Sequence, residues 1–210
     1  MTDPTPTIAE PESPSAASDG KAWVDLSAYS NGGYRPGRGV LVQLLWWFTS
    51  LAVFESGWFL LGRAKPTILR WFGARIGRGV VIKPHVRIKY PWRLTVGDHC
   101  WIGQGSWIDN LADVTIGDHV CVSQGVYLCT GSHNHRSRGF DLITRKIRVE
   151  NGAWLGAKAI VLGGVTVGAN AIASAGSVAT RDVAPATVVS GNPAEKTRDR
   201  TPCVEIRRVL

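Results

Sequence analysis

From Ile76 onward the chain repeats a pattern every six residues. Written in sixes it reads IGRGVV, IKPHVR and IKYPWR, then, after two extra residues, VGDHCW, IGQGSW and IDNLAD. After another two it continues as IGDHVC, VSQGVY and LCTGSH, and after an interruption as VENGAW through ATRDVA. Every leading position is Ile, Val, Leu or Ala, and the fifth position is mostly small or β-branched. A period of six fits neither an α-helix nor an alternating strand.

This period is expected of a chain that bends every six residues, so that three short strands close one triangular coil. Successive coils then stack about 4.8 Å apart and share backbone hydrogen bonds. The leading aliphatic residue points inward, and the fifth residue is small because the interior is narrow. Strand signals every eight to twelve residues, which a β-sandwich requires, are absent. The sequence therefore predicts an all-β parallel β-helix of hexapeptide repeats over residues 76–190.

The segments that flank the repeat differ from it in composition. Residues 1–22 form an acidic, Pro/Ser-rich stretch that we expect to be a disordered tail without a signal peptide. Residues 23–75 are predicted as an N-terminal helical segment, and residues 191–210 as a C-terminal tail. The apolar run at 40–61 has the length of a membrane span, but Gln43 and Glu55 interrupt it. An apolar helix packed on the body of the protein or lying on the membrane face is therefore favoured.

The charge distribution limits the classes of partner. The net charge is +8, and residues 1–20 contain four acidic residues and no Lys or Arg. The basic remainder suits an anionic ligand or an acidic membrane surface. Aromatic and basic residues do not alternate as in proteins that stack single-stranded bases, so nucleic acid is not expected as a partner. The four cysteines lack CxxC spacing, which favours reduced thiols in a cytoplasmic protein, with contact to the inner membrane face left open.

Several segments together resemble a known family. They are LRWFGARIG, IKYPWRLTVGD, VTIGDHVCVSQGVYLCTGSH, GAWLGAKAIVLGGVTVGANAIASAGSVATRDV and SGNPA, and they cover roughly residues 40–196. The chain resembles the left-handed β-helix acyltransferases, in particular the small acetyltransferases of bacterial exopolysaccharide synthesis of the colanic acid type. The resemblance implies a left-handed helix and a homotrimer that binds acetyl-CoA in the groove between two subunits. It also implies O-acetylation of a sugar hydroxyl.

The interruption, predicted as an excursion loop over 134–147, is where function is expected to concentrate. His133 ends the hexapeptide LCTGSH, so the sequence predicts that a coil holds it at the edge of the loop. Imidazole, with an ordinary pKa of about 6.5, suits the removal of a hydroxyl proton at neutral pH. His133 also matches the catalytic histidine of the family and is predicted to be the general base. His135 is the competing candidate and is predicted to contact substrate.

The remaining acceptor-side candidates surround this histidine. A base needs a partner for its other ring nitrogen, and the resemblance implies Asp109, with the neighbouring Asn110 as the alternative or as a substrate contact. Arg136 and Arg138, together with Arg145, could hold an anionic acceptor such as a nucleotide sugar or a lipid-linked glycan. The alternative is that these arginines only solvate the loop.

The resemblance also implies the contacts to acetyl-CoA. Trp154 matches an aromatic residue that lines the groove, and the backbone N–H of Ala157 matches a donor to the pantetheine arm or the thioester carbonyl. Ala175 and Thr180 match further backbone contacts. The cations predicted for the 3′-phosphate are Arg181, Lys196 and Arg198. Glu195 is inserted where the family has a shorter NPAK motif.

Two other classes of function are compatible with parts of the sequence. His85, His99 and His119 share the fourth position of their sixes, which is reminiscent of the zinc site of γ-class carbonic anhydrases on this fold. The HxxxxH ligand pair of those enzymes is absent, so corner histidines without metal are predicted. A non-catalytic scaffold recruited to membranes through 40–61 is the other class. A nucleophilic role for Cys129 is disfavoured, because the resemblance implies that both substrates bind in one groove and no covalent acyl-enzyme is needed.

Overall fold

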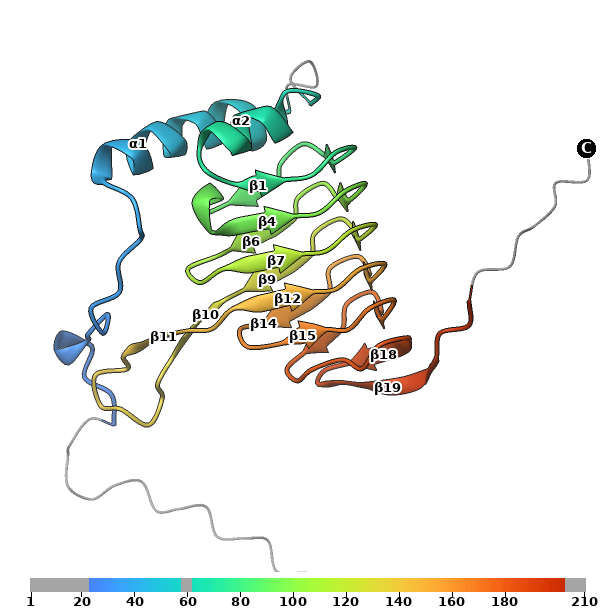
Figure 1. The fold of residues 1–210 in the computed structure, drawn as a ribbon. Coiled ribbons are helices and arrows are strands. Elements are labelled where there is room, and N and C mark those ends of the chain that lie inside the picture. Colours follow the sequence, from blue (N-terminus) through green and yellow to red (C-terminus); the bar gives the residue numbers. More distant parts are fainter. Residues whose placement is uncertain (1–22, 58–61, 203–210) are drawn as a thin grey trace, which may run out of the picture.

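The computed structural model describes residues 23–57 and 62–202 and is a three-sided solenoid (Figure 1). The predicted acidic tail at 1–22, residues 58–61 of the apolar run and residues 203–210 of the C-terminal tail lie outside the described residues. Two helices cover the N-terminal end of the solenoid, and a hairpin projects from its side.

Three sheets with parallel strands form the sides of the solenoid. Sheet A contains β1 (Arg75–Ile76), β4 (Leu94–Val96), β7 (Val114–Ile116), β12 (Ile147–Val149) and β15 (Thr166–Val167). Sheet B contains β2 (Val81–Ile82), β5 (Trp101–Ile102), β8 (Cys121–Val122), β13 (Trp154–Leu155), β16 (Ile172–Ala173) and β18 (Thr187–Gly191), with β19 (Ala194–Asp199) antiparallel at its end. Sheet C contains β3 (Arg87–Ile88), β6 (Trp107–Asp109), β9 (Tyr127–Cys129), β14 (Ile160–Leu162) and β17 (Val178–Ala179). The chain visits A, B and C in turn, which confirms the predicted parallel β-helix.

The leading aliphatic residues of the hexapeptides fill the interior. In sheet B, Ile82 pairs with Ile102, Ile102 with Val122, and Val122 with Leu155. All four side chains are buried. The register therefore stacks each leading residue directly on the leading residue of the preceding coil, as the period of six requires. Because the interior between the three sheets is narrow, only small or β-branched residues fit at the fifth positions.

The corners between sheets A and B explain the histidines at the fourth positions. His99 and His119 have left-handed backbone conformations with φ of 56°, and Gly79 takes the same place with φ of 66°. His is among the non-glycine residues that tolerate this conformation best. The two imidazole rings stack on adjacent coils with centroids 5.4 Å apart. Within residues 23–57 and 62–202, no three His, Cys, Asp or Glu side chains cluster as metal ligands would.

The interruption of the repeat is an antiparallel hairpin of β10 (Gly131–His133) and β11 (Leu142–Thr144). The expectation that His133 ends a coil is wrong, because the coil ends near Thr130 and His133 pairs with Leu142 in the hairpin. Ser132, which would be buried as a fifth position, is exposed. The Arg145 N–H donates to the Thr130 carbonyl at 2.9 Å, so the hairpin leaves and re-enters the solenoid at one point.

The N-terminal segment contains α1 (Val40–Thr49), a π-helical segment (Ser50–Phe54) and α2 (Lys65–Trp71). These helices lie over the first coil (Figure 1). The Trp46 indole N–H donates to the Ile88 carbonyl at 2.9 Å, and its ring packs edge-on against Phe54 and Phe72. None of the helices in the described part of the chain is long and apolar enough to cross a bilayer. Within residues 23–57 and 62–202, short 3₁₀ turns are also present at Leu26–Ala28 and at Pro91–Arg93.

We predict that enlarging a fifth-position residue destabilises the solenoid. Ala159 is fully buried before β14, and Ala159→Leu should lower the free energy of unfolding by about 1–3 kcal/mol through overpacking. Ala159→Ser is the matched control, because Ser106 and Ser177 occupy equivalent buried positions and donate to backbone carbonyls. Urea unfolding measures both variants. Equal stability of the leucine variant and the wild type would contradict the narrow interior.

Candidate active site

The side chain of His133 is held in one orientation by Phe140, across the hairpin. The Nδ1 atom of His133 lies 2.9 Å from the Phe140 carbonyl oxygen, and the two rings stack with centroids 4.5 Å apart and planes inclined by 8°. A carbonyl oxygen can only accept a hydrogen bond, so Nδ1 carries the proton of the neutral imidazole. The basic lone pair is then on Nε2. With the proton on Nδ1, Nε2 can accept a proton from a substrate, as a general base must.

Residues 25–30, which we call the N-terminal strap, fasten the hairpin from outside. The Leu142 N–H donates to the Ser30 carbonyl at 3.0 Å, and the Ser30 N–H donates to the Asp141 carboxylate at 3.2 Å. The Asp141 carboxylate also accepts from the Ser137 hydroxyl at 2.6 Å. The ring of Tyr29 lies 5.9 Å from that of His133. The strap therefore supports the strand that follows Phe140. No side-chain pattern in the sequence predicts the strap, because half of its hydrogen bonds to the hairpin join backbone groups.

A cavity of about 290 Å³ lies beside His133. Its lining includes His135, Arg145, Leu162 and Thr180. The structure thus brings the predicted base together with one predicted acceptor contact and one predicted cofactor contact. Arg145 adds a positive charge to the same cavity. The hairpin contributes His133 and His135 to the lining of the cavity. Arg145 comes from the base of the hairpin, and Leu162 and Thr180 belong to the solenoid.

Asn110 does not reach this cavity and is not available to substrate. Its side chain is fully buried, where Oδ1 accepts from the Tyr90 N–H at 2.9 Å and Nδ2 donates to the Tyr90 carbonyl at 2.7 Å. The prediction that Asn110 contacts substrate is therefore wrong. The residue instead pairs with the backbone of the coil below and satisfies two polar groups that would otherwise be buried without partners.

Asp109 makes its polar contacts on the outer side of sheet C. Its carboxylate lies 3.2 Å from the Lys89 ammonium and accepts from the Tyr127 hydroxyl at 3.4 Å. Burial raises the pKa of the Tyr127 phenol, so the phenol remains protonated and can donate. Within this chain the Nδ1 partner of His133 is the Phe140 carbonyl and not Asp109. A backbone carbonyl can fill this role at many positions, so side-chain patterns could not identify it.

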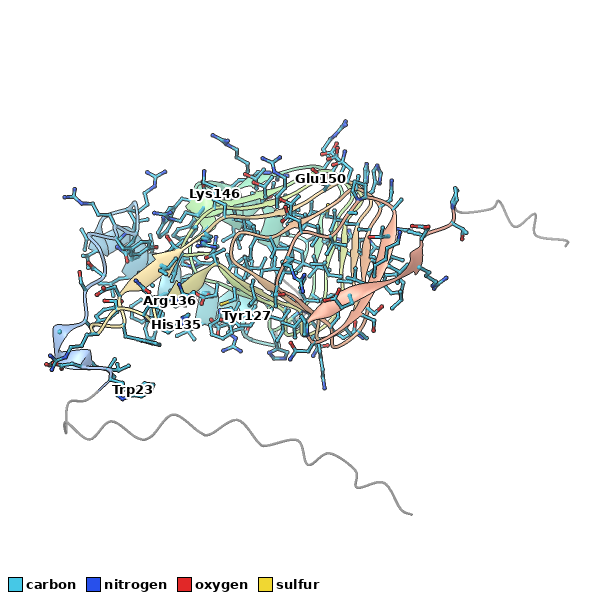
Figure 2. The ribbon with its side chains drawn as sticks, turned by 90° about the horizontal axis from the view of Figure 1, so that it is seen from below. Trp23, Tyr127, His135, Arg136, Lys146 and Glu150 are labelled. Atoms are coloured by element: carbon cyan, nitrogen blue, oxygen red, sulfur yellow. The ribbon has the colours of Figure 1, made fainter. Side chains whose placement is uncertain are left out.

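The two arginines predicted at the acceptor side have different surroundings. Arg138 forms an ion pair with Asp25 of the strap at 3.4 Å, and its carbonyl accepts from the Asp25 N–H at 2.8 Å. It therefore helps to fasten the hairpin. Arg136 is exposed next to His135 on the hairpin (Figure 2), and its N–H donates to the Asn134 side chain at 3.1 Å. Of the two, Arg136 is the better placed for an anionic ligand.

The predicted pantetheine contacts lie at a different edge of the solenoid. Ala157 and Ala175 occupy the corner between sheets B and C on adjacent coils, where the Gly176 N–H donates to the Ala157 carbonyl at 2.8 Å. Within the described residues, the N–H groups of both alanines have no hydrogen-bond partner. Thr180 follows β17, at the opposite end of sheet C. Trp154 lies on the outer face of sheet B, 44% exposed, and donates to the Ser123 hydroxyl at 2.9 Å.

The cations predicted for the 3′-phosphate lie near the C-terminal hairpin of β18 and β19. Arg181 pairs with Glu195 at 3.0 Å, and Lys196 pairs with Asp199 at 2.7 Å. All four side chains are exposed, so these pairs are weak and can open to a phosphate. Arg198 is exposed in β19. The inserted Glu195 is therefore the ion-pair partner of Arg181.

The cysteines of the described chain are free thiols. Cys100 is buried, its thiol donates to the Gly117 carbonyl at 2.9 Å, and burial raises its pKa. Cys121 and Cys129 are partly buried. The Cys129 thiol donates to the Gly131 carbonyl at 3.2 Å. Cys203 lies outside the described residues.

Comparisons with known proteins agree with this architecture. A family model described as the hexapeptide repeat of succinyl-transferase matches residues 93–129 and 146–181, on either side of the hairpin. A protein of Escherichia coli (strain K12) named "Putative colanic acid biosynthesis acetyltransferase WcaF" is 40% identical over 177 residues, which are 84% of this chain and 97% of that protein. The chain belongs to the hexapeptide-repeat acetyltransferase family.

Solved structures of related proteins share the fold. A hexapeptide-repeat-containing acetyltransferase from Vibrio cholerae O1 biovar eltor, complexed with acetyl coenzyme A, is 26% identical with a TM-score of 0.70. The match covers 77% of this chain and 88% of that one. A galactoside acetyltransferase in complex with coenzyme A is similar in fold, with 24% identity, a TM-score of 0.69, and coverage of 77% and 82% of the two chains.

We predict that Asn110→Ala destabilises the protein because it leaves the Tyr90 N–H and carbonyl buried without partners. The expected loss is about 1–3 kcal/mol in the free energy of unfolding. The control is Asn134→Ala in the hairpin, where the side chain accepts one bond from a partly exposed loop. Thermal unfolding compares the two. If both variants were as stable as the wild type, the assignment of Asn110 as a structural residue would be incorrect.

Proposed function

We propose that the protein is an acetyl-CoA-dependent O-acetyltransferase that acts on a sugar hydroxyl in exopolysaccharide or other glycan synthesis. The observation that carries the proposal is His133, whose Nδ1 donates to a backbone carbonyl and whose Nε2 is left as the base beside a cavity. The name of the Escherichia coli relative supports a polysaccharide acceptor. The acetyl-CoA complex of the Vibrio cholerae relative supports the donor.

His133 would act in two steps of one proton cycle. Nε2 accepts the proton of the acceptor hydroxyl while that oxygen forms its bond to the acetyl carbon. The resulting imidazolium then returns the proton to the sulfur when the carbon–sulfur bond breaks. The Phe140 carbonyl stabilises the imidazolium, because it accepts the Nδ1 hydrogen bond throughout. Acetyl-CoA supplies the acetyl group as a thioester, so no group on the protein needs to be acylated.

The N–H groups of Ala157 and Ala175, which have no partner among the described residues, fit a carbonyl-rich arm, because each offers one donor at a corner where Ala175 is exposed and Ala157 is half-buried. In one chain they are separated from the cavity of His133 by the width of sheet C. We therefore infer a homotrimer in which the hairpin of one subunit faces this corner on the next. Such a groove would unite the base with backbone donors that stabilise negative charge on the acetyl oxygen.

The acceptor side is positively charged. Arg145 lines the cavity and Arg136 is exposed on the hairpin beside His135. These side chains would favour an acceptor that carries phosphate, such as a nucleotide sugar or a lipid-linked glycan. Arg181, Lys196 and Arg198 are proposed to meet the 3′-phosphate, with Glu195 displaced from Arg181 when it binds.

The proposal predicts that His133→Ala lowers kcat by about 10²–10⁴-fold while the KM for acetyl-CoA changes little, because a base acts in the transition state. Release of free thiol from acetyl-CoA, measured with a panel of nucleotide sugars and lipid-linked glycans, reports the rate. His135→Ala is the matched control from the same cavity and should raise the KM for the acceptor while retaining turnover. If no acceptor yields His133-dependent thiol, the proposed function fails. The reverse behaviour of the two variants would assign the base to His135.

A further inference from the structure

The side of α1 that faces away from the solenoid is apolar and exposed. Leu41, Leu44, Leu45 and Phe48 follow one another at helical spacing and are 83%, 49%, 61% and 62% exposed. A surface helix of a globular protein normally turns such a row toward the core. We define the outer face of α1 as these four residues with three exposed neighbours, Val40, Trp47 and Leu51. Leu41, Leu45 and Phe48 form its centre, and Val40, Leu44 and Trp47 lie at its edge, where they also line the groove between the helix and the solenoid. A continuous apolar surface of this kind marks an interaction site.

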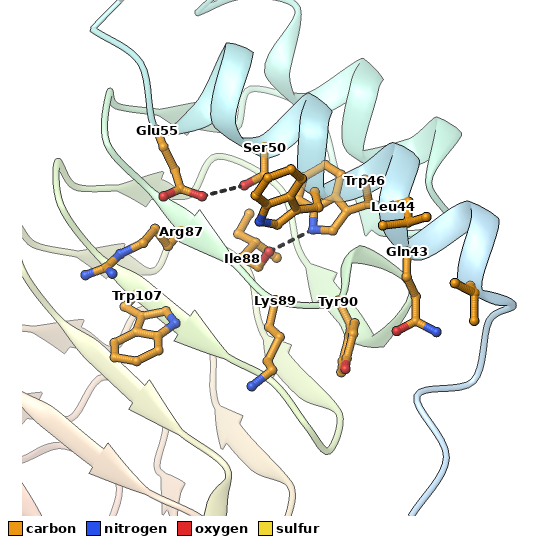
Figure 3. Close-up of a pocket in the computed structure, with 12 residues that line it drawn as sticks. Gln43, Leu44, Trp46, Ser50, Glu55, Arg87, Ile88, Lys89, Tyr90 and Trp107 are labelled. Carbon is orange, nitrogen blue, oxygen red and sulfur yellow. Dashed lines mark hydrogen bonds between the residues drawn. The ribbon is translucent and has the colours of Figure 1, made fainter.

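The polar residues of the same segment point the other way. Gln43, Ser50 and Glu55 line a groove of about 470 Å³ between the helix and sheet C, opposite Arg87 and Lys89 (Figure 3). There the Gln43 amide donates to the Arg38 carbonyl at 2.8 Å, and the Ser50 hydroxyl donates to the Glu55 carboxylate at 3.0 Å. The glutamate that interrupts the apolar run is therefore kept away from the outer face.

The rotation of α1 about its axis is fixed. Trp46 is buried, donates to the Ile88 carbonyl and packs against two phenylalanines, so the helix cannot turn its leucines inward without losing this anchor. The outer face is thus presented by the folded protein and does not depend on a rearrangement. A rigid apolar row needs an apolar partner to remove it from water.

The charge around the helix identifies the partner. Between Leu26 and Gly97 the sequence contains eleven Lys or Arg residues and one acidic residue, Glu55. Arg35 and Arg38 precede α1, Arg63 precedes α2 and Arg70 lies within α2, and all four side chains are exposed. A second copy of this chain would bring two basic surfaces together and be repelled. An anionic lipid surface attracts the arginines and accepts the leucines below its headgroups.

We propose that the outer face of α1 docks on an anionic membrane surface, with the helix axis in the plane of the interface. Each apolar side chain that enters the lipid contributes about tenfold to the partition coefficient. Each cation near the anionic surface contributes about fivefold, and salt screens this contribution. Neither contribution suffices alone, so binding should require both the apolar row and anionic headgroups. The inference does not depend on the acetyltransferase mechanism.

The test is co-sedimentation of the full chain with vesicles. The wild type should bind vesicles of phosphatidylethanolamine and phosphatidylglycerol and bind phosphatidylcholine vesicles at least tenfold more weakly. The double variant Leu41→Gln/Phe48→Gln should bind the anionic vesicles about 100-fold more weakly at unchanged melting temperature, because both side chains are exposed. Trp101→Gln is the control, since Trp101 is 61% exposed on sheet B, away from the helix.

Three outcomes would overturn the inference. The first is a wild type that stays in the supernatant with anionic vesicles. The second is a double variant that binds as well as the wild type, or a Trp101→Gln variant that loses binding equally. The third is equal binding to both kinds of vesicle, which removes the role of the arginines. Light scattering of the double variant completes the test, because a change of its oligomeric state would assign the face to a second copy of the chain.

Discussion

Each coil of the solenoid is hydrogen-bonded to the next along all three sheets, and this stacking constrains everything attached to it. The Trp101 N–H donates to the Val120 carbonyl at 3.0 Å, and the Trp154 N–H donates to the Ala171 carbonyl at 2.8 Å. A segment that leaves the solenoid must return where it left, or the coils above lose their register. Thr130 and Arg145 meet that condition at the base of the hairpin. A rigid base is what allows a projecting strand to hold a histidine in place.

The corners of the triangle differ in how they satisfy the backbone. Between sheets A and B, the Asp98 carboxylate accepts the Arg78 N–H at 2.7 Å, and the Asp118 carboxylate accepts the Asp98 N–H at 2.7 Å. The hydrogen bonds from Arg78 lower the pKa of Asp98. Between sheets B and C, the corresponding N–H groups of Ala157 and Ala175 have no such partner among the described residues. The corner between sheets A and B is thus closed by side chains of the chain itself, whereas the described residues do not satisfy these N–H groups between sheets B and C.

The sequence predicted the solenoid well because its narrow interior leaves a mark on every sixth residue. It misplaced His133 because LCTGSH begins with a buried leucine, Leu128, like any other hexapeptide. After Thr130 the chain departs into the antiparallel pairing of β10 with β11, in which His133 faces Leu142, and such pairing has no period of its own. The hexapeptide register does not show which of the two neighbours, Asp109 or Asn110, points toward the solenoid interior. Their predicted roles therefore could not be decided from the sequence. The partner of His133 is a main-chain oxygen, which no residue type reveals.

The N-terminal strap joins parts of the chain that the repeat does not connect. Residues 25–30 are separated by more than one hundred positions from Asp141 and Leu142, yet their backbone fixes the strand beside His133. The solenoid and the support of His133 therefore depend on different contacts: the repeat pairs each coil with the next, whereas the strap pairs with the hairpin. The repeats alone lack the contacts that order His133, because the strap that supports its hairpin lies outside them. The orientation of His133 thus depends on the strap and the hairpin, two segments that do not follow the hexapeptide repeat.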